Sequence, residues 1–218
     1  MNIKAVLFDM DGTLLNTIED ITDAVNHTLL KFGYAQRTLD EVKHMVGSGA
    51  VKLMERALPE GKETPDFETI LKDYCDYYFE NCNIKTGPYD HITDLLKELK
   101  NRGYKIAIVS NKPMDAIQEL KKQYFDDCID VAIGVTDKLR RKPYPDQCLE
   151  AMKLLNVSKE DCIYVGDSDI DHQTAVNTGI PCISCLWGFR TKEELLAAGA
   201  GNNFFVEDPL EILEIVTK

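Results

Sequence analysis

Short apolar runs alternate along most of the chain with longer amphipathic segments. The runs are rich in Val and Ile and continuous, which is typical of strands that a parallel sheet buries on both faces. We predict strands at Ile3–Phe8, Lys105–Val109, Val131–Ile133, Cys162–Val165 and Cys182–Cys185. Amphipathic patterns predict helices at His91–Asn101, Met114–Gln123, Asp146–Leu155, Asp169–Thr178 and Leu210–Val216. This alternation indicates an α/β fold with a doubly wound, parallel, Rossmann-like sheet.

The segment between the first two predicted strands is unusually long. It shows only helical patterns: one begins near Asn16-Thr17, a second is led by Asp40 and Glu41, and a third spans Phe67–Phe79. A structureless loop of this length within one domain would be implausible. We therefore predict an inserted helical domain at residues 16–85, and an α/β core domain formed by residues 1–15 and 86–218.

The composition narrows the possible partners. The 218 residues are 44% hydrophobic and 28% charged, as in an ordinary globular protein, and the formal net charge is −12. An acidic surface repels nucleic-acid phosphates and anionic lipid, so we expect neither nucleic acid nor membrane as a partner. The sequence leaves the choice between monomer and dimer open.

The N-terminus and the cysteines indicate a cytoplasmic protein. The opening MNIKAVLFDMDG is not a secretory signal, and no apolar stretch approaches the roughly 18 residues that span a membrane. Seven cysteines, an odd number, favour free thiols in a reducing compartment. Cys182 and Cys185 form a C-x-x-C motif, which could be a redox pair or half of a zinc site. Because the motif lies in a predicted strand and has no second copy, we predict buried free thiols.

Polar residues follow the predicted strands. In an open α/β sheet, ligands bind beyond the carboxyl ends of the strands. The residues found there are Asp9-Met10-Asp11-Gly12-Thr13, Ser110-Asn111-Lys112, Arg140-Arg141-Lys142-Pro143 and Gly166-Asp167-Ser168-Asp169-Ile170-Asp171. Acids, a hydroxyl and a lysine are therefore expected to converge on one edge of the sheet.

These residue types fit phosphoryl transfer. Asp9, Asp11 and Asp167 would repel one another without a hard cation between them, and two carboxylates with a backbone carbonyl suit Mg²⁺. Ser110 can donate to a phosphoryl oxygen and Lys142 can neutralise the remaining charge. One aspartate could then attack phosphorus while the other protonates the leaving oxygen.

Four motifs carry a family resemblance. FDMDGTL, IVSNKP, RKPYPD and VGDSDID match in order the motifs of haloacid dehalogenase superfamily phosphatases. The chain resembles this superfamily over essentially its whole length, and within it the phosphoglycolate phosphatases, including the stretch VGSGAVKLMERAL. A single D-x-D-G-T would be weak support, whereas four motifs at predicted strand ends or loops are specific.

The resemblance implies roles for individual residues. It implies that Asp9 is the nucleophile and Asp11 the general acid and base, and that Asp9, Asp11 through its carbonyl, and Asp167 bind Mg²⁺. Asp171 would be a supporting carboxylate. The phosphate-binding residues implied are Thr13, Ser110, Asn111 and Lys142. The inserted helical domain would be a cap.

A glycine-rich turn in the predicted cap is a further candidate. Gly47, Ser48 and Gly49 precede the predicted helix Ala50–Leu58. Backbone N–H groups at a helix N-terminus can hold an anion, such as the carboxylate of phosphoglycolate. Alternatively, the two glycines only permit a tight turn between cap helices.

Alternatives to a phosphatase of 2-phosphoglycolate remain open. Pyrophosphate, nucleotides and sugar phosphates are other possible substrates. A phosphomutase of the same superfamily is disfavoured because NTIEDITDAV is acidic and lacks the histidine of mutase caps. A dehalogenase would lack an acid at position 11. A non-catalytic binding relative would have lost one of the key acids or Lys142, and none is lost.

Overall fold

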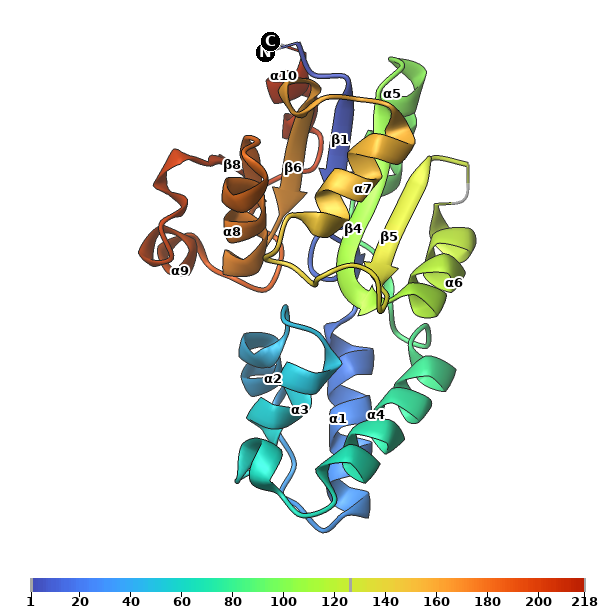
Figure 1. The fold of residues 1–218 in the computed structure, drawn as a ribbon, viewed down its shortest axis with the longest axis vertical. Coiled ribbons are helices and arrows are strands. Elements are labelled where there is room, and N and C mark those ends of the chain that lie inside the picture. Colours follow the sequence, from blue (N-terminus) through green and yellow to red (C-terminus); the bar gives the residue numbers. More distant parts are fainter. Residues whose placement is uncertain (1, 126, 218) are drawn as a thin grey trace. The chain divides into compact units, whose positions relative to one another are not determined.

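The computed structural model describes residues 2–125 and 127–217. The chain forms two compact units: Met1–Leu15 together with Pro88–Lys218, and Asn16–Gly87. Figure 1 shows that the first unit contains the main sheet and its helices, and that the second is helical.

The first unit is built on one parallel sheet. Its strand order is β5-β4-β1-β6-β7-β8, and the neighbouring strands pair in parallel. The strands are β1 (Ala5–Phe8), β4 (Lys105–Pro113), β5 (Val131–Val135), β6 (Cys162–Gly166), β7 (Cys182–Cys185) and β8 (Phe204–Val206). This sheet confirms the predicted doubly wound α/β fold.

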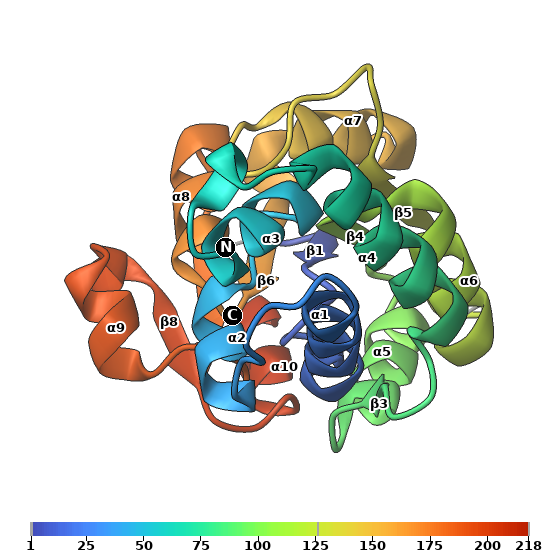
Figure 2. The same ribbon diagram turned by 90° about the horizontal axis from the view of Figure 1, so that it is seen from below.

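Helices cover both faces of the sheet. They are α5 (Ile92–Asn101), α6 (Met114–Tyr124), α7 (Asp146–Leu155), α8 (Asp169–Thr178), α9 (Lys192–Ala197) and α10 (Glu211–Val216). Figure 2 shows α7 and α8 on one side of the sheet, and α5 and α10 on the other. Ala5 and Leu7 of β1 pack in one core cluster with Met152 of α7 and Ala175 of α8. Val6 and Phe8, which alternate with Ala5 and Leu7 along the strand, are also fully buried, as expected for a strand covered on both faces.

The register of the central strands decides where polar residues meet. Phe8, the last residue of β1, pairs with Ile108 of β4 and Val165 of β6. The residues that follow these three paired positions therefore lie at the same edge of the sheet.

The helical unit is held by contacts of its own. It contains α1 (Ile18–Lys31), α2 (Leu39–Met45), α3 (Ala50–Ala57) and α4 (Phe67–Asn81). The ring of His27 stacks on Tyr77 with centroids 3.8 Å apart, which joins α1 to α4. The buried Asp20 carboxylate accepts hydrogen bonds from the N–H groups of Lys85 and Thr86, at 3.0 and 2.9 Å. These bonds tie the end of the unit to its first helix. The short strands β2 (Leu15–Asn16) and β3 (Gly87–Pro88) pair where the chain passes from one unit to the other.

Some elements differ from the sequence prediction. Neither β8 nor α9 was predicted from the sequence, and β4 continues through Pro113 instead of ending at Val109. All seven cysteines are free, and Cys182 and Cys185 are buried in β7. Within the described residues, no helix has the length and apolar character needed to cross a membrane.

Candidate active site

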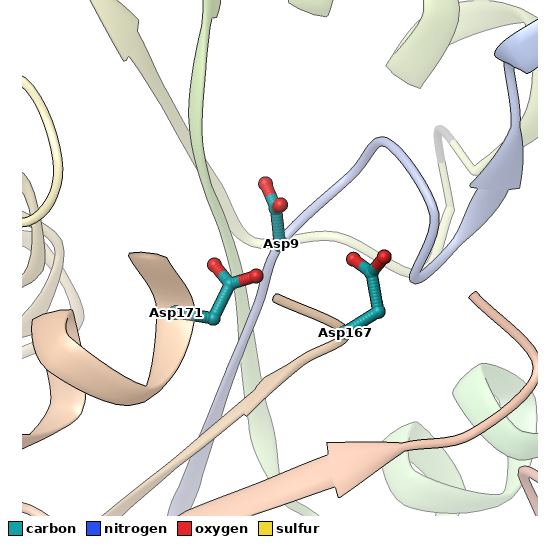
Figure 3. A group of neighbouring side chains, drawn as sticks. All are labelled: Asp9, Asp167 and Asp171. Atoms are coloured by element: carbon teal, nitrogen blue, oxygen red, sulfur yellow. The ribbon is translucent and has the colours of Figure 1, made fainter. Parts of the chain in front are cut away.

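Three carboxylates converge at the carboxyl edge of the sheet. Asp9 follows β1, Asp167 follows β6, and Asp171 lies in the first turn of α8. One oxygen from each lies within 4.8 Å of the others, and all three residues are buried. Figure 3 shows the three side chains around a common space. The backbone N–H of Asp9 donates to the carbonyl of Val165, so the strand pairing continues to the residue that carries the first carboxylate.

Lys142 supplies positive charge to this cluster. Its ammonium lies 2.8 Å from Asp9 Oδ1 and 2.7 Å from Asp171 Oδ1, and it donates to the hydroxyl of Tyr164 at 3.0 Å. Burial alone would lower the pKa of Lys142, but the charges of Asp171 and Asp9 outweigh it and raise that pKa. The lysine therefore remains protonated and balances part of the negative charge.

Burial and the negative charge that Lys142 does not balance raise the pKa values of two aspartates. Burial, followed by the charge of Asp171, raises the pKa of Asp9 above its usual range, although Lys142 opposes the shift. Burial and then the charge of Asp171 likewise raise the pKa of Asp167, against hydrogen bonds from Phe189 and Thr13. Three close acids with one buried lysine therefore form a set that a divalent cation would stabilise.

Hydrogen bonds distinguish Asp171 from Asp167. Asp171 Oδ1 faces Lys142 and the Tyr164 hydroxyl, while its Oδ2 accepts from the N–H and hydroxyl of Ser168. Among the described contacts, Asp167 accepts one hydrogen bond on Oδ1, from Thr13 Oγ1 at 3.0 Å, and one on Oδ2, from the N–H of Phe189 at 2.7 Å. Asp167 thus retains more lone-pair capacity for a metal ion, whereas the oxygens of Asp171 are occupied by protein donors.

The end of β4 is tied to the segment that carries Lys142. The Asn111 side chain donates to the carbonyl of Lys142 at 3.1 Å and accepts from its N–H at 2.8 Å. The buried Gln147 donates from Nε2 to the carbonyl of Ser110 at 3.0 Å. Ser110, Asn111 and Lys142 are thereby held in one hydrogen-bonded group.

The structure places the other predicted residues as follows. The hydroxyl of Thr13 donates to Asp167, so its contact here is with a carboxylate, and the predicted role of Thr13 in binding phosphate stays a prediction. Asp11 lies beside Lys112, with 3.1 Å between its Oδ1 and Nζ. Gly12 has φ of +82°, the conformation that the turn after Asp11 requires and that glycine adopts without strain.

The loop after β7 also contacts the site, through a position, Gly188, for which the sequence predicted no role. The indole N–H of Trp187 donates to the carbonyl of Thr13 at 3.0 Å, and the N–H of Phe189 donates to Asp167. Between them, a Cβ on Gly188 would lie 2.3 Å from Asp167 Cβ. The sequence could not reveal the role of Gly188, which lies three residues beyond the predicted strand, because these contacts join residues far apart in the sequence.

The glycine-rich turn of the helical unit has an ordered conformation. Gly47 and Gly49 have φ of 117° and 84°, and α3 begins after Gly49 without a side-chain cap. Arg56 donates to the carbonyl of Met45 at 2.7 Å and to Ser48 Oγ at 3.5 Å. The positive φ angles explain both glycines, and the role of the turn in binding substrate stays a prediction.

The parallel α/β sheet, with buried acids and a lysine at its carboxyl edge, is the arrangement of a family of hydrolases. Residues 6–185 match the haloacid dehalogenase-like hydrolases, and the chain belongs to this family. A phosphoglycolate phosphatase from Colwellia psychrerythraea is 34% identical over 200 residues, covering 88% of each chain. An N-acetylmuramic acid 6-phosphate phosphatase from Pseudomonas aeruginosa is 26% identical, covering 100% of this chain and 96% of its own. A solved structure from Lactobacillus delbrueckii subsp. bulgaricus, described as a putative phosphoglycolate phosphatase, is 36% identical with a TM-score of 0.94, covering 99% of both chains.

Proposed function

We propose that the protein is a magnesium-dependent phosphatase that hydrolyses a small phosphorylated metabolite through an aspartyl-phosphate on Asp9. The main support is the placement of Asp9, whose buried carboxylate ends the central strand 2.8 Å from Lys142 and close to Asp167. A nucleophile needs a cationic partner and nearby donors if it is to approach a phosphate dianion. Both are present around Asp9.

In the first step, an oxygen of Asp9 forms a bond to phosphorus. The bond between phosphorus and the leaving oxygen breaks, its electron pair goes to that oxygen, and Asp11 supplies a proton to give the alcohol. Ser110 and Lys142 are proposed to bind the phosphoryl oxygens, and the bonds of Asn111 to the Lys142 backbone hold this group together.

In the second step, Asp11 takes a proton from water. The water oxygen attacks phosphorus, the bond to Asp9 breaks, and inorganic phosphate is released with the Asp9 carboxylate restored. Asp11 ends the cycle protonated, ready for the next leaving group.

The acidic residues are proposed to hold Mg²⁺. The fit rests on the carboxylate oxygens of Asp9 and Asp167, which are buried close together and have free lone pairs, and on the Asp11 carbonyl implied by the family pattern. Oxygen ligands of this kind are those that Mg²⁺ prefers. When bound, Mg²⁺ offsets negative charge on the transferring phosphoryl group. Asp171, whose oxygens face Lys142, Tyr164 and Ser168, is proposed to orient Lys142.

The proposed substrate class is that of small phosphate monoesters resembling 2-phosphoglycolate. This rests on the Colwellia and Lactobacillus relatives, which share about a third of their residues with this chain. The Pseudomonas relative named for a sugar phosphate keeps sugar phosphates as the second candidate. Pyrophosphate and nucleotides belong in the same screen.

A hydrolysis screen tests this proposal. Phosphate release is measured over a panel of phosphorylated metabolites, with Mg²⁺ and then with a chelator. We expect the highest kcat/KM on a small anionic monoester and no turnover in chelator. Full activity in chelator would contradict the role assigned to Asp167, and no hydrolysis of any phosphate ester would contradict the proposed activity.

The turn at Gly47–Gly49 is proposed to bind the part of the substrate that is not transferred. Ser48→Ala keeps both glycines and removes one donor. If this donor binds an anionic group, kcat/KM on the preferred metabolite should fall about tenfold or more, as expected for one hydrogen bond to a charged group. The value on p-nitrophenyl phosphate, which lacks that group, should stay unchanged. Equal losses on both substrates would mean that the turn is only structural.

A further inference from the structure

Lys112 is a buried lysine to which the proposed chemistry assigns no role. Its Nζ lies 3.1 Å from Oδ1 of Asp11, and the two side chains are 3% and 16% exposed. Both residues belong to the unit that contains the main sheet. The pair is therefore set by the packing of that unit, at the residue proposed to act as general acid and base.

The backbone presents Lys112 at a defined position. β4 runs to Pro113, but its register with β5 shifts between Val109 and Pro113. Beyond the shift, the N–H of Lys112 donates to Ser110 Oγ at 3.3 Å, and the preceding Asn111 is bonded to the backbone of Lys142. The backbone at Lys112 is thus anchored through the two residues that precede it.

The ammonium of Lys112 faces an oxygen of Asp11 that accepts no hydrogen bond from any other described residue. Asp11 Oδ1 is buried, and within residues 2–125 and 127–217 no protein donor meets it with hydrogen-bond geometry. The ammonium of Lys112 is its ion-pair partner. A carboxylate without such a partner can rotate about its side-chain bonds, and a small displacement of a catalytic group is costly.

We propose that Lys112 is a positioning residue that holds the Asp11 carboxylate toward the leaving oxygen. This inference rests on the proposed function. It makes Lys112 act through Asp11 and not on the phosphoryl group, so its loss should affect kcat more than KM. The loss should also be largest for substrates whose leaving group needs a proton.

The first test compares three variants. Lys112→Met should lower kcat about tenfold to a hundredfold on an alkyl phosphate, and much less on p-nitrophenyl phosphate, whose leaving group is acidic. KM and inhibition by inorganic phosphate should change little. Lys112→Arg, which retains the charge, should recover part of kcat. Lys153→Met removes an exposed lysine from its pair with Glu150, and should leave all values unchanged.

A double-mutant comparison gives the sharper test. The rate of alcohol release from an alkyl phosphate in a single turnover is measured for Lys112→Met, Asp11→Asn and the double variant. If Lys112 acts through Asp11, adding Lys112→Met to Asp11→Asn should cause no further loss. If the double variant instead loses activity by the product of the two single losses, the inference is overturned. A large rise in KM with weaker inhibition by phosphate in Lys112→Met would also overturn it.

Failure of this inference is distinguishable from failure of the proposed function. Steady turnover by a folded Asp9→Asn protein would contradict the aspartyl-phosphate mechanism, whatever Lys112 does. Conversely, an inactive Asp9→Asn protein with multiplying losses for Lys112 and Asp11 would overturn only the role of Lys112. Circular dichroism and thermal unfolding establish that each variant is folded. If Lys112→Met does not fold, the same comparison is made with Lys112→Arg, where losses that multiply with those of Asp11→Asn again overturn the inference.

Discussion

Gly188 lies so close to Asp167 that no side chain fits there. A Cβ would stand 2.3 Å from Asp167 Cβ and 2.4 Å from the carbonyl oxygen of Gly12. Because one of these neighbours is backbone, the clash cannot be relieved by rotating a flexible side chain. Alanine at this position must therefore displace the loop after β7 or the Asp167 carboxylate.

We expect Gly188→Ala to impair catalysis through Asp167. The Mg²⁺ concentration for half-maximal activity should rise and kcat should fall by about tenfold or more, since small misplacements of catalytic groups are costly. Gly201→Ala is the matched control, because a Cβ on Gly201 meets nothing within 4 Å. Wild-type magnesium dependence and kcat in Gly188→Ala would show that the loop does not position Asp167.

At the scale of residues, the sequence predicted which acids lie at the edge of the sheet, but not the contacts that surround them. Asp9, Asp11 and Asp167 could be predicted because each follows an apolar run, and strand ends meet at one edge of a parallel sheet. The pairing of Lys112 with Asp11 and the approach of Gly188 to Asp167 could not, since both depend on how loops pack in three dimensions.

At the scale of elements, the start of α8 links stability to the site. Ser168 caps this helix: its Oγ accepts from the N–H of Asp171, and the Asp171 carboxylate accepts from the N–H of Ser168. The same Asp171 carboxylate contacts Lys142. One reciprocal cap therefore stabilises the helix and also holds the acid that is proposed to orient the lysine.

Ser168→Ala should reduce both stability and activity. Loss of the cap should lower the free energy of unfolding by about 0.5–2 kcal/mol, and a less well-held Asp171 should lower kcat. Thr191→Ala removes a similar cap from α9 and serves as the control, for which we expect a stability loss alone. Both are measured by chemical denaturation and steady-state kinetics. An equal effect of the two variants on kcat would contradict the positioning role of Ser168.

The elements themselves were predictable where their patterns were long or strongly apolar. The bounds of α7, α8 and β7 agree with those predicted from the sequence. β8 has only three residues, Phe204–Val206, and pairs with β7 alone at the edge of the sheet, so it carries too short a pattern to identify. The extension of β4 could not be predicted because its last residues before Pro113 are the polar Ser110, Asn111 and Lys112, which break the apolar pattern.

At the scale of the whole molecule, an acidic protein concentrates further negative charge in one buried site. The chain carries a net charge of −12, and burial with mutual repulsion raises the pKa of Asp9 from 3.8 to about 8 and that of Asp167 from 3.8 to about 7. Between roughly pH 4 and pH 8, the folded metal-free protein therefore holds protons that the unfolded chain releases. Its stability should fall as pH rises through this window.

Magnesium should counteract this loss. Because Mg²⁺ binds ionised carboxylates, the increase in Tm that it produces should be larger near pH 8 than near pH 6. Asp167→Asn removes one of the titrating groups, so the increase in Tm that Mg²⁺ produces should differ less between pH 6 and pH 8. Thermal unfolding with Mg²⁺ and with chelator at both pH values measures it, and an equal or smaller increase near pH 8 would contradict the proposed site.

The covalent intermediate on Asp9 is the central claim, and trapping it is the most direct test. The protein is mixed with a ³²P-labelled substrate and Mg²⁺, quenched in acid within one turnover, and digested so that the labelled peptide can be identified. We predict label on the peptide that contains Asp9, lability to hydroxylamine as for an acyl phosphate, and neither label nor turnover in a folded Asp9→Asn protein. Steady turnover by Asp9→Asn, or label on a different residue, would contradict the account.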